Sequence, residues 1–162
     1  NASITLSGLK LNLRIDRIDS NPDDSILLID YKTGQIKPGH WFGERIQEPQ
    51  LPLYACKMNP QGIAFAGIDK GKIQWRSVVN KESHLSPLGK PPKRIPEETG
   101  WPDWKKLLDY WKAKLSKLAE EFINGRLSID PLKSGNVCRV CGYHSLCRIG
   151  ENKTDEEIEG TD

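Results

Sequence analysis

The chain has 162 residues, of which 36% are hydrophobic and 28% are charged, a composition typical of one globular domain with its own core. The formal net charge of +2 neither favours nor excludes a nucleic-acid partner, so such a partner has to be inferred from local motifs. No uncharged apolar run is long enough to cross a bilayer, and no secretory signal precedes the first motif, so we expect no membrane partner.

The first predicted elements are two β-strands joined by a turn. In the first strand, apolar residues alternate with polar ones, which gives a single apolar face: Leu9, Leu11, Leu13 and Ile15. The segment Asp19–Asp24, "DSNPDD", has the composition of a turn. Ser25–Thr33 follows, and its run "ILLI" is typical of a strand that is buried on both faces. We therefore predict a β-hairpin between the two strands.

A short helix and a second strand pair are predicted next. The helix ends at Met58 and begins near Pro49 or Pro52, because proline fits only the first turn of a helix. The strands Gly62–Ile68 and Lys72–Val79 follow, joined by the tight turn "DKGK". We expect these two strands to belong to the same small central sheet as the hairpin.

A long amphipathic helix follows a proline-containing loop at 81–100. From Trp104 to Phe122, apolar residues recur at three- and four-residue steps, and Gly125 suits the position just past the helix end. The order of elements predicts a mixed α/β or α+β domain built on a small central sheet. We expect residues 1–150 to form this domain and the acidic residues 151–162 to form a disordered tail.

An acid and a base stand two positions apart at the end of the buried strand. Asp30 and Lys32 therefore project from the same face of the sheet. A turn centred near Asp23 sets Asp16 opposite Asp30, whereas a one-residue slip pairs Asp16 with Ile29. Directly opposed Cβ atoms lie about 5 Å apart, which is close enough for two carboxylates to share one cation.

This arrangement suits metal-dependent phosphodiester hydrolysis. Asp16, Asp30 and the backbone carbonyl of Tyr31 offer the oxygen ligands that Mg²⁺ or Mn²⁺ accepts. The metal would polarise the scissile phosphate and acidify a bound water, while Lys32 would orient or deprotonate that water and stabilise charge on the phosphate. Each residue alone is more typical of a surface charge cluster, but the set at the end of a buried strand favours a site.

Three motifs in this part of the chain together resemble the RecB-type branch of the PD-(D/E)XK nucleases. They are "LRIDRID" at 13–19, "LLIDYKTG" at 27–34 and "QLPLYA" at 50–55. The resemblance implies that Asp16 is a metal ligand and that Asp30 and Lys32 are the acid and base of the nuclease motif. It also implies that Gln50 and Tyr54 position the lysine, the DNA backbone or both. Independently, their spacing puts these two residues on one face of a helix.

The resemblance also implies a biological setting. It indicates a restriction-endonuclease-like fold, in which helices flank a central mixed β-sheet. It also indicates a domain that cuts DNA in repair or recombination, with exonuclease activity favoured over endonuclease activity. Such domains accompany a helicase domain or subunit in the bacterial cytoplasm. The competing class is a non-catalytic, metal-stapled module that binds nucleic acid or a protein partner.

Three cysteines cluster near the end of the chain, in "CRVCGYHSLC". One interpretation is a zinc site formed by Cys138, Cys141, His144 and Cys147, since tetrahedral sites with three cysteines and one histidine exist. The other is a [4Fe–4S] cluster held by four thiolates, of which Cys138, Cys141 and Cys147 supply three. The resemblance to AddB-type helicase-nuclease subunits favours the iron–sulfur cluster, with its fourth cysteine far upstream of the first strand.

The upstream cysteine has no match, because Cys56 follows "QLPLYA" directly and is the first cysteine of the chain. The helix that opens the family fold has no counterpart either. We therefore expect the chain to be a carboxyl-terminal fragment of a longer protein. Such a fragment would lack part of the catalytic site and of the cluster, and need not be active alone.

Overall fold

The computed structural model describes residues 2–33, 36–69, 71–126, 128–131 and 137–147. The chain forms two compact units, residues 1–124 and residues 125–162, and each is described by itself. The first unit contains both sheets, the two long helices and every residue of the predicted acidic site. Across the part of the chain that the structure describes, no helix is both long and apolar enough to span a bilayer.

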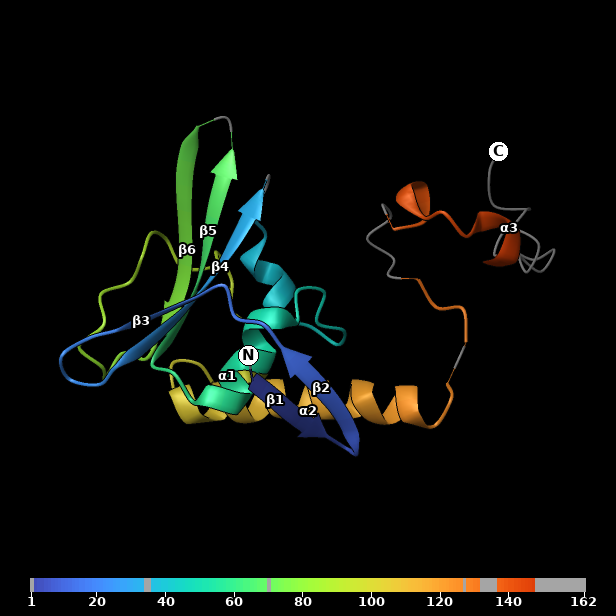
Figure 1. Ribbon diagram of the computed structural model, residues 1–162, viewed down its shortest axis with the longest axis horizontal. Coiled ribbons are helices and arrows are strands. Elements are labelled where there is room, and N and C mark those ends of the chain that lie inside the picture. Colours follow the sequence, from blue (N-terminus) through green and yellow to red (C-terminus); the bar gives the residue numbers. More distant parts are fainter. Residues whose placement is uncertain (1, 34–35, 70, 127, 132–136, 148–162) are drawn as a thin grey trace. The chain divides into compact units, whose positions relative to one another are not determined.

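A four-stranded mixed sheet forms the centre of the first unit (Figure 1). Its strands, in spatial order, are β3 (Arg17–Ser20), β4 (Ile26–Thr33), β5 (Gly62–Asp69) and β6 (Lys72–Val79). β4 and β5 are parallel, and the other two pairs are antiparallel. The parallel pair requires a crossover, which contains helix α1 (Gln50–Met58). The predicted mixed sheet and the helix between its strand pairs are confirmed.

Both faces of the sheet are covered, so β4 is buried on both sides as predicted. The face toward the helices holds the larger core, which includes Leu28, Leu51, Ile63, Phe65, Val78, Leu107 and Trp111. The opposite face carries a smaller core of Leu27, Ile29, Ala64, Ala66 and Val79, packed against Trp75, Leu85 and Leu88. Alternation along β4 therefore sends Leu28 and Asp30 toward the helices and Leu27 and Ile29 away from them.

Helix α2 (Trp104–Ile123) packs on α1 and confirms the predicted long helix. The Asp103 side chain caps its start by accepting a hydrogen bond from the Lys106 backbone N–H. Past its end, Gly125 adopts a φ of 67°, the left-handed conformation that favours glycine. The Trp111 indole N–H donates to the Trp41 carbonyl at 2.9 Å, which joins the helix to the crossover loop.

The predicted hairpin is wrong in its first strand. β2 (Leu9–Leu13) pairs with β1 (Ala2–Leu6) in a separate two-stranded sheet, and the strand beside β4 is Arg17–Ser20. The cause is a tight turn at Ser7 and Gly8, whose φ angles of 45° and 88° are both positive, as a two-residue hairpin turn requires. The turn before β4 is shorter than the predicted turn segment Asp19–Asp24, because Asp19 and Ser20 belong to β3.

The register beside β4 still follows the predicted alignment. Arg17 pairs with Ile29 and Ile18 with Leu28, and the same alignment continued by one residue brings Asp16 beside Asp30. Asp16 itself stands just ahead of β3 in a bend of the chain. The site therefore depends on a short strand that begins immediately after its first acid.

Candidate active site

The acid of β4 is almost fully buried. Asp30 is only 2% exposed and lies on the helix-facing side of the sheet. Burial raises the pKa of its carboxyl above the ordinary range, because the charged form is poorly solvated. Its Oδ2 accepts no aligned hydrogen bond from the described part of the chain, although Lys32 Nζ lies 3.0 Å away as an ion-pair partner. This oxygen therefore retains capacity for a further electropositive partner.

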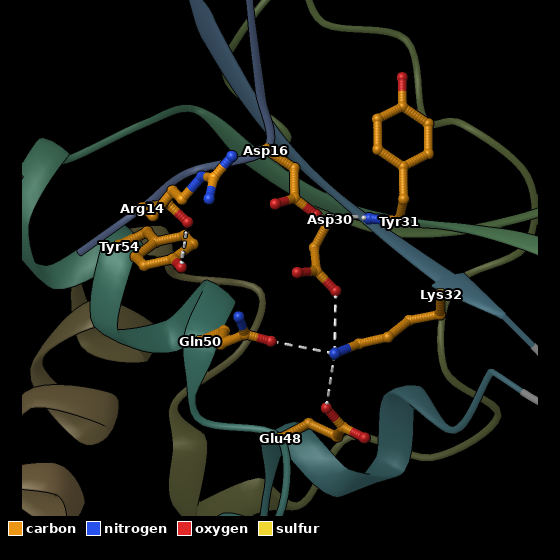
Figure 2. Close-up of polar contacts among 8 residues, drawn as sticks. All are labelled: Arg14, Asp16, Asp30, Tyr31, Lys32, Glu48, Gln50 and Tyr54. Atoms are coloured by element: carbon orange, nitrogen blue, oxygen red, sulfur yellow. Dashed lines mark hydrogen bonds and ion pairs between the residues drawn. The ribbon is translucent and has the colours of Figure 1, made fainter. Parts of the chain in front are cut away.

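The Lys32 ammonium sits among three acceptors (Figure 2). Its Nζ lies 3.0 Å from each of Asp30 Oδ2, Glu48 Oε2 and Gln50 Oε1. The same atom lies 5.5 Å from the centroid of the Phe65 ring, close enough for a cation–π contact. Burial alone would lower the pKa of Lys32, but the contacts with Asp30 and Glu48 outweigh it and raise the pKa. The lysine is therefore a fixed ammonium at neutral pH.

The second acid, Asp16, is exposed and is attached to β4 through the backbone. Its Oδ2 accepts a hydrogen bond from the Tyr31 N–H at 3.2 Å, at the residue between Asp30 and Lys32. Its negative charge adds to the rise in the pKa of Asp30, so the two carboxylates interact. Figure 2 shows both side chains directed into the space in front of β4. The structure thus brings Asp16, Asp30 and Lys32 together.

Gln50 and Tyr54 lie one turn apart on α1 but have different partners. The Gln50 side-chain oxygen accepts from Lys32, whereas the Tyr54 hydroxyl donates to the Arg14 carbonyl at 2.6 Å. Tyr54 is 4% exposed, and burial raises the pKa of its phenol, so the hydroxyl stays protonated and able to donate. Tyr54 therefore fixes the backbone two residues ahead of Asp16, while Gln50 orients the lysine.

Substitution of Tyr54 by phenylalanine tests this role. We expect a loss of about 1 kcal/mol of unfolding free energy from the missing hydrogen bond. Because the segment that carries Asp16 is then less constrained, Mg²⁺ should bind several-fold more weakly. Calorimetric titration of metal checks the binding, and urea unfolding checks the stability. Tyr110→Phe is a suitable control, because it also removes a hydroxyl that donates to a backbone carbonyl. That carbonyl belongs to Gly43, which, among the described residues, contributes nothing to the contacts of Asp16 or Asp30. A Tyr54→Phe protein with parental metal affinity would contradict the role.

Glu48 is a site residue that the sequence reasoning missed. Its carboxylate holds Lys32 from the side opposite Asp30, and its side chain is 35% exposed. It precedes Pro49 in a loop and follows no helical or strand periodicity. The only signal in the sequence is an acid two residues ahead of Gln50.

The donors in this site fit a hard divalent cation. Within the described ranges, no group of three or more histidine, cysteine or acidic side chains is placed to hold a metal. Mg²⁺ needs fewer protein ligands, since it is typically bound through one or two carboxylates while it keeps several waters. Asp16 and Asp30 offer two such carboxylates, and the buried Asp30 Oδ2, which forms an ion pair with Lys32 but no aligned hydrogen bond within the described ranges, is an acceptor that a cation would satisfy. The Tyr31 carbonyl stays a predicted third ligand.

The cysteine segment belongs to the second unit. Cys138 begins a short 3₁₀ turn that ends at Val140, and Cys147 ends the short helix α3 (His144–Cys147). Cys138, Cys141 and Cys147 are free, partly buried thiols. The side chain of His144 and the predicted tail at 151–162 lie outside the described residues. Both the iron–sulfur and the zinc ligand sets therefore stay predictions.

Cys56 has a different environment. It lies on α1 in the first unit, and its thiol is directed at the Leu108 carbonyl, with Sγ and O 3.9 Å apart. Burial raises the pKa of this thiol to about 12, which keeps it protonated. Cys56 also follows "QLPLYA" and so does not match the upstream position that the family resemblance implies for the fourth cluster ligand.

Comparisons with known proteins identify helicase/deoxyribonuclease subunits among the relatives of this chain. Among relatives named as subunits of an ATP-dependent helicase/deoxyribonuclease, the protein of Alkaliphilus oremlandii is 23% identical over 88% of this chain and 17% of its own. The Clostridium tetani protein is 25% identical over 96% of this chain and 18% of its own. The chain thus spans less than a fifth of these relatives.

A solved structure, that of SSO0001, aligns with 87% of this chain and 56% of its own at a TM-score of 0.45 and 18% identity. The sequence pattern of the PD-(D/E)XK nuclease superfamily matches residues 2–148. The relatives named as helicase/deoxyribonuclease subunits confirm the resemblance inferred from the motifs. Because the family match covers most of its length, the chain belongs to the PD-(D/E)XK nuclease superfamily.

Proposed function

We propose that this chain is a metal-dependent DNA nuclease domain that hydrolyses phosphodiester bonds with Mg²⁺ or Mn²⁺. The observation that carries the proposal is the buried Asp30 carboxylate, whose Oδ2 lies 3.0 Å from the fixed Lys32 ammonium. A buried charged acid costs stability unless something compensates it, and such groups concentrate at functional sites. A surface charge cluster would not need this burial.

Each residue has a distinct task in the proposed reaction. Asp16 and Asp30 would hold the metal, with the Tyr31 carbonyl as a further ligand. When bound, Mg²⁺ supplies Lewis-acid polarisation of the phosphate and makes a water molecule more acidic. Lys32 would stabilise the developing negative charge through its ammonium, and it would donate to a phosphate oxygen or the attacking water by exchanging one of its three 3.0 Å contacts. Orienting the water and deprotonating it both remain roles that Lys32 could have in this reaction.

The wider role follows from the relatives. Their names combine a helicase with a deoxyribonuclease, which supports DNA as the substrate and a helicase domain or subunit as the partner. We propose a function in DNA repair or recombination in the bacterial cytoplasm, with exonuclease activity favoured over endonuclease activity. Since the chain spans less than a fifth of these relatives, the helicase partner belongs to the proposal.

The cysteine segment is proposed as a structural [4Fe–4S] site with a fourth ligand outside Cys138, Cys141 and Cys147. Zinc bound by these cysteines and His144 is the alternative. Protein purified without oxygen separates the two, because an iron–sulfur protein is brown and a zinc protein is colourless. Metal analysis that finds one zinc per chain in colourless protein would defeat the cluster.

Metal dependence is the direct test of the nuclease proposal. The full-length protein that contains this chain is expected to cut DNA in Mg²⁺ or Mn²⁺, and to lose all cleavage in EDTA. Asp16→Asn removes a ligand at an exposed position, so cleavage should disappear without loss of stability. Asp19→Asn is the matched control, because Asp19 pairs with Leu27 in the register of β3 and β4, so its side chain lies on the face of the sheet opposite Asp30. Intact single- and double-stranded DNA in every metal would favour the non-catalytic binding module instead.

A further inference from the structure

The Lys32 ammonium is surrounded by oxygens before any substrate is present (Figure 2). An ammonium has three N–H groups, and its fourth bond leads back along the side chain. Three oxygens lie 3.0 Å from Nζ: Asp30 Oδ2, Glu48 Oε2 and Gln50 Oε1. A phosphate oxygen can therefore approach Nζ as closely only by taking the place of one of them.

Two of these oxygens are poorly suited to leave. The Asp30 side chain is 3% exposed, and a buried carboxylate that loses its counter-ion is left uncompensated, which is costly. Gln50 is neutral, so a phosphate in its place would add a second anion beside Glu48 on the same ammonium. Like charges this close repel each other. Neither exchange is favourable while Glu48 stays on the lysine.

Glu48 is the contact that can be released. Its side chain is 35% exposed, so water can solvate the carboxylate once it turns away. Its backbone N–H donates to the His40 carbonyl at 3.2 Å, which holds the loop in place. Release therefore needs a rotation of the side chain only, and exposed side chains rotate within picoseconds to nanoseconds. A phosphate oxygen in its place keeps one negative charge against the ammonium.

The charge of the site also favours this exchange. Asp16, Asp30 and Glu48 supply three carboxylates and Lys32 supplies one ammonium, a formal charge of −2. A bound Mg²⁺ brings these groups only to zero, so a phosphate meets no net attraction from them. With Glu48 turned into water, where its charge is screened, the remaining groups and the ion carry +1. An anion is then attracted to the place that Glu48 has left.

We propose that Glu48 occupies the position of the substrate phosphate on Lys32 and that the DNA backbone displaces it on binding. The proposal rests on the nuclease function proposed above and assigns the phosphate subsite of that site. Glu48 is a positioning residue: it holds the ammonium in place in the free protein and competes with phosphate for it. The same competition weakens the binding of the phosphate that cleavage leaves on the product, which favours product release.

Urea unfolding in saturating Mg²⁺ with increasing inorganic phosphate tests the competition, because a ligand of the folded protein raises its unfolding free energy. Glu48→Gln keeps the shape of the side chain but removes its charge, so phosphate should bind about tenfold more tightly. In the Lys32→Met background, Glu48→Gln should bring no gain. Glu44→Gln is the matched control, because Glu44 pairs with Lys114 on α2, and it corrects for the general stabilisation by phosphate.

Cleavage by the full-length protein gives a second measurement. In Glu48→Gln, kcat/KM for DNA should rise about tenfold, mainly through a lower KM, because the competitor is lost from the free protein. An unchanged KM would overturn the proposal. Parental phosphate affinity in Glu48→Gln would also overturn it, as would the weaker affinity expected if Glu48 were a metal ligand. A tenfold gain that persists in Lys32→Met would show simple repulsion without competition for the lysine, and would overturn it too.

These results separate the failure of this proposal from that of the nuclease function. If the full-length protein cuts DNA but Glu48→Gln changes neither phosphate affinity nor KM, only the displacement of Glu48 is wrong. If phosphate affinity depends on Glu48 and Lys32 as expected, but the full-length protein never cuts DNA in Mg²⁺ or Mn²⁺, the nuclease function is wrong and the phosphate subsite stands.

Discussion

Replacement of Asp30 by asparagine is expected to abolish metal-dependent cleavage and, without divalent metal, to raise the free energy of unfolding at neutral pH. The loss of a metal ligand removes several kcal/mol of transition-state stabilisation, so the rate should fall about a thousandfold or more. The gain in stability has a separate cause. The Asp30 carboxylate is 2% exposed, and the amide that replaces it has no charge to desolvate.

The pH dependence of this gain follows from the direction of the shift. Burial raises the folded-state pKa of Asp30 above its unfolded value, so the folded protein binds the proton more tightly. The stability that Asp30 contributes is complete below the unfolded pKa and is lost as the pH rises through the folded pKa. Asparagine does not titrate. The advantage of Asp30→Asn should therefore be small in acid and grow toward neutral pH.

Urea unfolding in EDTA and in Mg²⁺ measures both effects. Mg²⁺ that binds the folded parent protein should raise its free energy of unfolding, and the free energy of Asp30→Asn should rise much less. In Mg²⁺, the stability advantage of Asp30→Asn over the parent should therefore shrink or reverse. Asp19→Asn serves as the control, because its exposed pair with Arg17 should change stability by less than about 1 kcal/mol. A destabilised Asp30→Asn protein in EDTA at neutral pH would show that Asp30 is retained for structure rather than for metal.

Local patterns in the sequence predict the elements that carry the acids. The run "ILLI" predicts a strand buried on both faces, and the two cores on either side of β4 confirm it. The same strand orients Asp30 and Lys32 by simple alternation. The position of Asp16 depends on the turn before β4, and Asn21 N–H donates to the Ser25 carbonyl across that turn. These features are local, so sequence reasoning can reach them.

Features that depend on the crossover are beyond such reasoning. Trp41 is fully buried and packs against Phe65 with ring centroids 4.4 Å apart, yet it lies in a segment without apolar periodicity. Glu48 reaches Lys32 only because the crossover returns to the end of β4. The i,i+4 spacing places Gln50 and Tyr54 on one face of α1, but it does not specify which residue holds the lysine. Which of these two residues contacts Lys32 depends on how α1 packs against β4.

Substitution of Lys32 by methionine is the second change with a large expected effect. Loss of the ammonium should lower the cleavage rate about 10²- to 10⁴-fold, because the group that stabilises phosphate charge is gone. In EDTA at neutral pH, the unfolding free energy should fall by about 1–3 kcal/mol, since the buried Asp30 loses its counter-ion. Lys114→Met is the matched control, because Lys114 pairs with Glu44, whose side chain is 84% exposed.

The loss of unfolding free energy in Lys32→Met should depend on whether Asp30 is charged. At low pH Asp30 is protonated and needs no counter-ion, so the loss should shrink as the pH falls. The double variant Asp30→Asn/Lys32→Met should lose little stability relative to Asp30→Asn, because the amide does not require the ammonium. A double-mutant cycle by urea unfolding measures this coupling. Additive effects would mean that Lys32 serves Glu48 and Gln50 rather than Asp30, and parental cleavage by Lys32→Met would remove the lysine from the proposed chemistry.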